Sequence, residues 1–138
     1  MIPAPLFHYT CACGHEALLD DPVVRPAKDL IPPARLAQYD DLRALFLYAW
    51  FTDLAEPDAD ALGLTRHQIP CVRTKHRWVV ISAVARPVPW TSVRRQVPTW
   101  TRDKLEGAHG AMPRHWFVSR TPTPVRYDPI AFRARNAG

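Results

Sequence analysis

The chain has 138 residues, of which 47% are hydrophobic and 22% charged, a balance typical of one globular domain with a single core. No apolar run reaches the roughly 18 residues of a membrane-spanning helix, and no secretory signal is recognised, so we expect a cytoplasmic protein without a membrane partner. Lys and Arg outnumber Asp and Glu by 18 to 13, and 15 of the 18 are arginines. Arginine favours contact with phosphate groups, so a nucleic acid or a dinucleotide is one expected partner, and a generally basic surface is the alternative.

The N-terminal third alternates short predicted strands with turns. Residues 6–10 (LFHYT) have the aromatic and β-branched character of a strand. Residues 15–20 predict a short helix with Gly14 at its start, and 23–26 a second strand that ends at proline. Residues 27–40 contain consecutive prolines and predict an irregular loop.

Further predicted elements follow in chain order. Strands are expected at 47–52, 68–72, 77–83, 114–119 and 124–127. Short helices are expected just before Gly63 and over 91–96, and the tail is expected to fray from about Asp128. The predicted fold is therefore a compact single α+β domain over 1–138, with more strand than helix.

Cysteine and histidine near the N-terminus raise the question of a metal site. Cys11, Cys13 and His15 lie two apart, which is tighter than the C-x(2–4)-C spacing of structural zinc sites. The remaining candidate ligands are His67, Cys71 and His76. Because free cysteines are often buried as small apolar residues, we predict no metal.

Five tryptophans divide into two predicted groups. Those within apolar strands are expected in the core, namely Trp50, Trp78 and Trp116. The other two, Trp90 and Trp100, lie in a proline-rich stretch. Several arginines accompany them there, namely Arg94, Arg95 and Arg102. This second group could stack on bases and contact phosphates, or serve in simple surface packing.

Several of these segments together resemble the opening of the ADP-ribosyltransferase fold. The matching pieces are the strand LFHYT at 6–10, the helix at 15–19, the strand VVRP at 23–26 and the aromatic segment AWFTD at 49–53. They resemble most the branch with a histidine on the first strand, which includes DNA-targeting toxins and poly-ADP-ribose polymerases. The resemblance covers roughly residues 5–55 and implies a split sheet with short helices.

The resemblance also implies a site that uses NAD as substrate. In that family the first-strand histidine binds a ribose hydroxyl, a role that falls to His8, with Tyr9 and Thr10 beside it. An aromatic residue stacks on nicotinamide, which implies Trp50 or Phe51, with Thr52 in the same cleft. Arginines that could hold the pyrophosphate are Arg25 and Arg73.

One departure from the family concerns its catalytic glutamate on a late strand. The corresponding strand here, RHWFVSR at 114–120, has no carboxylate. Either Glu106 or Asp53 is therefore expected to substitute, or the fold no longer performs the standard transfer. The expected function is transfer of ADP-ribose from NAD to a DNA or RNA base. Two alternatives are a non-catalytic nucleic-acid-binding module and an enzyme resembling the RNA 2′-phosphotransferases. The last would use His8, Arg73, Arg114 and His115.

Overall fold

The computed structural model describes residues 4–30, 32–36, 46–56, 61–62, 74–81 and 86–129. The strands are β1 (Phe7–Thr10), β2 (Val23–Val24), β3 (Ala49–Thr52), β4 (His76–Val80), β5 (Val88–Pro89), β6 (Trp116–Ser119) and β7 (Thr123–Tyr127). The helices are α1 (Ala12–Asp20), α2 (Pro33–Leu36), α4 (Trp90–Val93) and α5 (Thr99–Glu106). Short 3₁₀ turns are η1 (Ala27–Asp29), η4 (Arg94–Gln96) and η5 (Pro113–His115).

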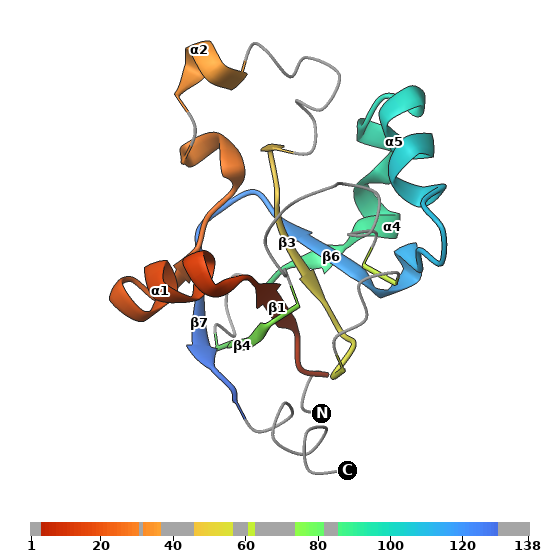
Figure 1. The fold of residues 1–138 in the computed structure, drawn as a ribbon. Helices are drawn as coiled ribbons and strands as arrows, with labels where there is room; N and C mark the ends of the chain where they lie inside the picture. The colour runs from red at the N-terminus through yellow and green to blue at the C-terminus, as the bar shows by residue number, and fades with distance from the viewer. Residues whose placement is uncertain are drawn as a thin grey trace.

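The strands form one seven-stranded antiparallel sheet in the order β2-β7-β4-β1-β3-β6-β5. Figure 1 shows α1 on one side of the strands and α4 with α5 on the other side of the picture. Central pairings are continuous along β1 with β4 and along β3 with β6, four residue pairs in each case. Between β1 and β3 the register has one pair, Phe7 opposite Thr52. The sheet is therefore least closely paired at its centre.

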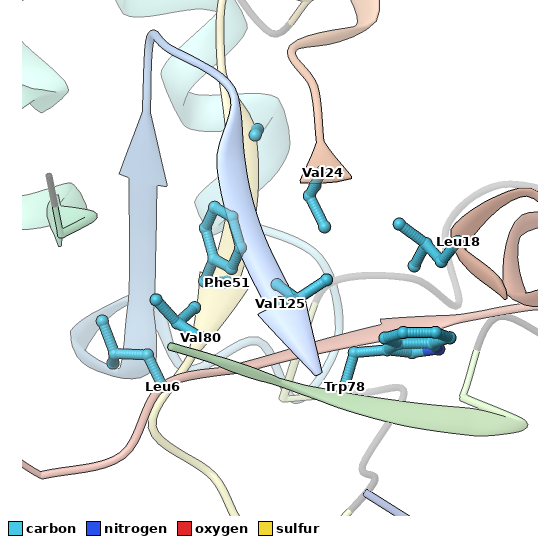
Figure 2. Close-up of a cluster of buried hydrophobic side chains, with 8 residues drawn as sticks. Leu6, Leu18, Val24, Phe51, Trp78, Val80 and Val125 are labelled. Atoms are coloured by element: carbon cyan, nitrogen blue, oxygen red, sulfur yellow. The ribbon is translucent and has the colours of Figure 1, made fainter. Parts of the chain in front are cut away.

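The first hydrophobic core lies where α1 covers the β4 side of the sheet. It contains Leu6, Leu18, Val24, Ala49, Phe51, Trp78, Val80 and Val125. Figure 2 shows Leu18 from α1 and Val24 from β2 pointing toward Trp78 and Val125. Because successive strand residues point to opposite faces, Phe51 enters this core while its neighbour Trp50 does not.

A second core lies under α4 and α5. It contains Tyr48, Trp90, Val97, Trp116 and Val118, with Trp50 and Leu105 packed against it. Tryptophan dominates this core: the Trp50 and Trp90 ring centroids are 5.2 Å apart, and the Trp50 and Trp116 rings meet edge-on at 6.0 Å. The sheet thus separates two cores, and β3 contributes to both.

The predicted α+β class is confirmed: one seven-stranded antiparallel sheet is accompanied by a few short helices. Within the described ranges, no helix is long and apolar enough to cross a membrane. The predicted irregular loop 27–40 is partly wrong, because η1 and α2 lie within it. The predicted strand 68–72 lies outside the described residues, and α5 was not predicted. Asp128 is tied to Arg77 by an ion pair of 2.6 Å, so order extends to the predicted start of the tail.

Candidate functional site

A cavity of about 710 Å³ opens where β1 and β3 diverge. Its wall takes residues from β1, α1, β2, η1 and β3, together with Tyr48, Leu105 and Trp116. The cavity therefore reaches from α1, which covers the first core, to α5, which covers the second. Volumes of about 300–1,000 Å³ with mostly apolar walls are usual for cofactor and substrate pockets.

His8 joins the two strands at this divergence. Its ring Nδ1 lies 2.9 Å from the main-chain oxygen of Trp50, and the His8 ring centroid is 5.7 Å from that of Phe51. A carbonyl oxygen can only accept, so Nδ1 carries the proton and donates it. In the neutral ring Nε2 is then an acceptor, and the orientation of the imidazole in the cavity wall is fixed.

Tyr9 and Thr10 follow His8 on β1, and both contribute to the cavity wall. Tyr9 lines the cavity, but its hydroxyl donates to the main-chain oxygen of Leu54 over 2.8 Å, and burial raises its pKa to about 12. Thr10 lines the cavity beside Gly14 of α1. The structure therefore gives the Tyr9 side chain a position that ties β1 to the chain after β3.

Aromatic residues of β3 form the facing wall. Trp50, Phe51 and Thr52 all line the cavity, where the resemblance implies they lie together. The Trp50 indole is supported from behind by the tryptophans of the second core. The Thr52 hydroxyl accepts a hydrogen bond of 3.1 Å from the amide of Leu54, which fixes the turn after the strand.

An arginine and a carboxylate lie together at the cavity's edge. Arg25 follows β2, lines the cavity and pairs with Asp21 over 2.8 Å, and both side chains are substantially exposed. Such exposed pairs contribute little to stability and separate readily. The second predicted pyrophosphate ligand, Arg73, lies outside the described residues.

Glu106 does not line the cavity. Its carboxylate accepts two hydrogen bonds from Arg94, at 2.8 and 2.6 Å, and one of 2.7 Å from the Trp90 indole. The bonds from Arg94, and then that from Trp90, hold the pKa of Glu106 below its ordinary value despite partial burial. This carboxylate fastens the end of α5 to α4 and η4.

Asp53 also lies away from the cavity wall. Its Oδ1 is 2.7 Å from Nδ1 of His115, and Arg114 Nε approaches the other ring nitrogen of His115 at 3.3 Å. The register places this group directly beyond the end of β3 and before the start of β6, since Thr52 pairs with Trp116. The histidine and arginine expected for a phosphotransferase site, His115 and Arg114, do not line the cavity to which His8 contributes.

Among the described residues no three metal-binding side chains cluster. His15 and His76 do meet, with ring centroids 3.8 Å apart and planes 9° from parallel. The Trp78 indole donates to His15 Nδ1 over 3.1 Å, and His76 Nδ1 lies 3.2 Å from the Tyr127 hydroxyl. This is a stacking arrangement; Cys71 and His67 lie outside the described residues.

Sequence reasoning missed several residues of the cavity wall. Tyr48, Leu105 and Asp21 were not singled out, and Asp21 is the one carboxylate in the described part of the wall. Asp21 lies just before the predicted VVRP strand, and this position in the sequence could have indicated that it lies near the site. Leu105 comes from a helix that the sequence did not predict.

Comparisons of the chain with protein-family models, curated proteins and solved structures give no match. Function must therefore be argued from the cavity and its chemistry.

Proposed function

We propose that the protein is an ADP-ribosyltransferase that moves ADP-ribose from NAD to a DNA or RNA base. The observation that carries the proposal is the cavity at the divergence of β1 and β3, with His8 oriented by the Trp50 carbonyl. The single residue pair between these strands fits the split sheet that the sequence resemblance implies. Within the proposal, His8 holds a ribose hydroxyl.

The cavity wall suits the parts of NAD in different ways. Its predominantly apolar and aromatic lining can cover the nicotinamide, with Trp50 and Phe51 nearest to His8. Arg25 at the edge can exchange its single contact with Asp21 for a pyrophosphate, because a guanidinium can bind phosphate oxygens bidentately. In the proposed reaction the ribose–nicotinamide bond breaks and nicotinamide leaves with its electron pair. The acceptor nitrogen then bonds the ribose carbon and loses a proton.

The proposed reaction needs a group that accepts the proton of the acceptor nitrogen. Glu106 and Asp53 are engaged elsewhere, with Arg94 and His115 respectively. Asp21 is the carboxylate in the described cavity wall, and its exposure leaves it accessible to an incoming acceptor. We therefore assign it the proton of the acceptor.

The nucleic-acid acceptor is inferred from charge. The chain carries a formal net charge of +5, mostly from arginine. Phosphate contacts by Lys and Arg supply most of the affinity of nonspecific nucleic-acid binding, so such a chain favours a polyanionic acceptor over a small neutral molecule.

The proposal is tested with labelled NAD and DNA or RNA oligonucleotides. We expect transfer of label, NAD binding by calorimetry, and a loss of NAD affinity of about 3- to 10-fold for His8→Ala, the value of one hydrogen bond. Asp21→Asn should slow transfer while leaving NAD affinity within about 3-fold of the unmodified protein. His109→Ala is the matched control, because His109 is exposed and outside the cavity wall. Absence of NAD binding at millimolar ligand would refute the enzyme.

A second function is favoured by one observation. Because Glu106 is fastened by Arg94 and Trp90, the late-chain carboxylate serves the packing of α5 rather than the cavity. A non-catalytic nucleic-acid-binding module would show this arrangement too. It would bind oligonucleotides in a salt-dependent way and be indifferent to NAD.

A further inference from the structure

Trp100 differs from the other four tryptophans in its exposure. Its side chain is 49% exposed, whereas Trp78, Trp90 and Trp116 are 4% exposed or less. Trp50 is half-buried in the cavity wall. All five tryptophans lie in the described ranges, so Trp100 is the one indole that a molecule in solution can reach broadly. Exposed aromatic rings beside positive charge are the platforms on which nucleic-acid bases stack.

The helix that carries Trp100 has two distinct sides. Thr101 of α5 is buried and Leu105 lines the cavity, so these residues face the protein. Trp100 and Lys104 are four residues apart and share the exposed side. The Lys104 ammonium lies 4.0 Å from the centroid of the Trp100 ring. A ring and a cation are thus presented together to solvent.

Further positive charge lies in η4, which Arg102 of α5 contacts. Arg102 donates to the main-chain oxygen of Arg94 over 3.2 Å, which holds the start of α5 against η4. Arg95 of η4 is exposed and has no ion-pair partner among the residues that the structure describes. Arg94 itself is neutralised by Glu106. Asp103 is the one acidic residue among these exposed positions of α5 and η4.

We propose that Trp100, Lys104 and Arg95 form a contact surface for single-stranded nucleic acid. A base stacks on the Trp100 indole, and the two cations contact the phosphates on either side. Single strands are the fitting partner because their bases can leave the stack and meet an aromatic ring, whereas duplex bases are enclosed. An ammonium above the ring can move aside to a phosphate without losing a favourable charge contact.

The contact surface holds the acceptor strand of the proposed transferase, and this role rests on the proposed function. Leu105 follows Lys104 directly and lies in the cavity wall, so a strand held at Trp100 is kept close to the cavity. The surface would therefore deliver an acceptor base to the site that holds NAD. Binding of the strand itself requires neither NAD nor catalysis.

The test is oligonucleotide binding without NAD, followed by tryptophan fluorescence and by salt titration. Homopolymeric single-stranded DNA and RNA and a duplex of equal length serve as probes. We expect quenching on addition of either single strand and little on addition of duplex. Trp100→Ala should weaken single-strand binding by about 5- to 100-fold, and Trp100→Phe by less, because a smaller ring still stacks. Arg95→Ala should reduce the slope of log affinity against log salt by about 0.7.

Two controls separate the surface from general effects. Leu19→Ala removes an exposed apolar side chain from α1, and Arg126→Ala removes an exposed charge from β7. Both should leave binding within about 2-fold of the unmodified protein. Equal binding by Trp100→Ala and the unmodified protein, or equal losses from Arg95→Ala and Arg126→Ala, would overturn the inference. If the protein binds single strands through Trp100 but does not bind NAD, the contact surface stands and only the proposed enzyme activity is refuted.

Discussion

Gly14 lies where α1 passes closest to β1. A Cβ atom at this position would stand 2.0 Å from the Thr10 hydroxyl oxygen and 3.3 Å from its Cβ, so any side chain forces a movement. The Thr10 side chain is β-branched and therefore has few alternative rotamers. Close packing of the helix on the strand that carries His8 thus depends on a single missing methyl group.

Gly14→Ala should lower the free energy of unfolding by about 1–2 kcal/mol, measured by urea denaturation. Crowding in a packed site costs about 1–3 kcal/mol, and the better helix propensity of alanine offsets up to about 1 kcal/mol. The double variant Thr10→Ala/Gly14→Ala removes the clashing atoms and should recover most of the loss. A double variant that is no more stable than Gly14→Ala would contradict this explanation.

Individual residues show what the sequence could reveal about the site. His8, Trp50, Phe51 and Thr52 were expected in one cleft because the resemblance implies it, and all four line one cavity. The environment of Glu106 could not be predicted from the sequence. Its partners lie 12 and 16 residues away, and only the packing of α5 on α4 brings them together.

At the scale of elements, α1 is fastened to the sheet by stacked imidazoles. His15 of α1 lies on His76 of β4 and contacts Tyr127 of β7, with ring centroids 4.4 Å apart in the latter pair. Burial, and then the neighbouring His15 and Lys75, lower the pKa of His76 from its ordinary 6.5. The folded protein therefore holds this ring in its neutral form more strongly than the unfolded chain does.

Stability should fall as the pH falls from about 6.5 toward the lowered pKa of His76. In that window the unfolded chain binds the proton at this site more readily than the folded protein, and proton uptake therefore favours unfolding. Thermal unfolding at pH 8 and pH 5 measures the effect, and His76→Gln should reduce the difference. His109→Gln, a change at an exposed loop position, should leave it unaltered. An unchanged pH dependence in His76→Gln would contradict the assignment.

Element prediction succeeded for strands and failed for α5. Strands at β1, β2, β6 and β7 follow aromatic and β-branched runs that a short window detects. The segment before α5 contains several prolines, and no helix was predicted beyond the one over 91–96, which α4 and η4 occupy in the structure. In the structure Pro98 occupies the N-cap of α5, where a residue without an amide hydrogen costs the helix nothing. Pro98 thus marks the start of a helix, although prolines in a sequence usually indicate that a helix is interrupted.

At the scale of the whole molecule, Arg77 joins segments from across the chain. It donates to Asp128 after β7 over 2.6 Å and to the main-chain oxygen of Ala55 after β3, and its guanidinium lies 4.6 Å above the Phe7 ring of β1. The side chain is almost fully buried, and Nε has no hydrogen-bond partner among the described residues. One planar cation thus links four strands or their ends.

Replacing Arg77 should therefore test the cohesion of the entire sheet. Arg77→Ala leaves Asp128 without its partner and a cavity over Phe7, so we expect a loss of about 3 kcal/mol in the free energy of unfolding. Arg77→Lys keeps the charge but cannot reach Asp128 and Ala55 together, since an ammonium lacks the fork of a guanidinium, and should lose about 1.5–3 kcal/mol. Arg126→Ala on β7 changes the charge equally at an exposed position and should stay within about 0.5 kcal/mol. If both arginine-to-alanine variants unfold at the same urea concentration, Arg77 has no such linking role, and hydrophobic packing between the two cores must hold the strands together.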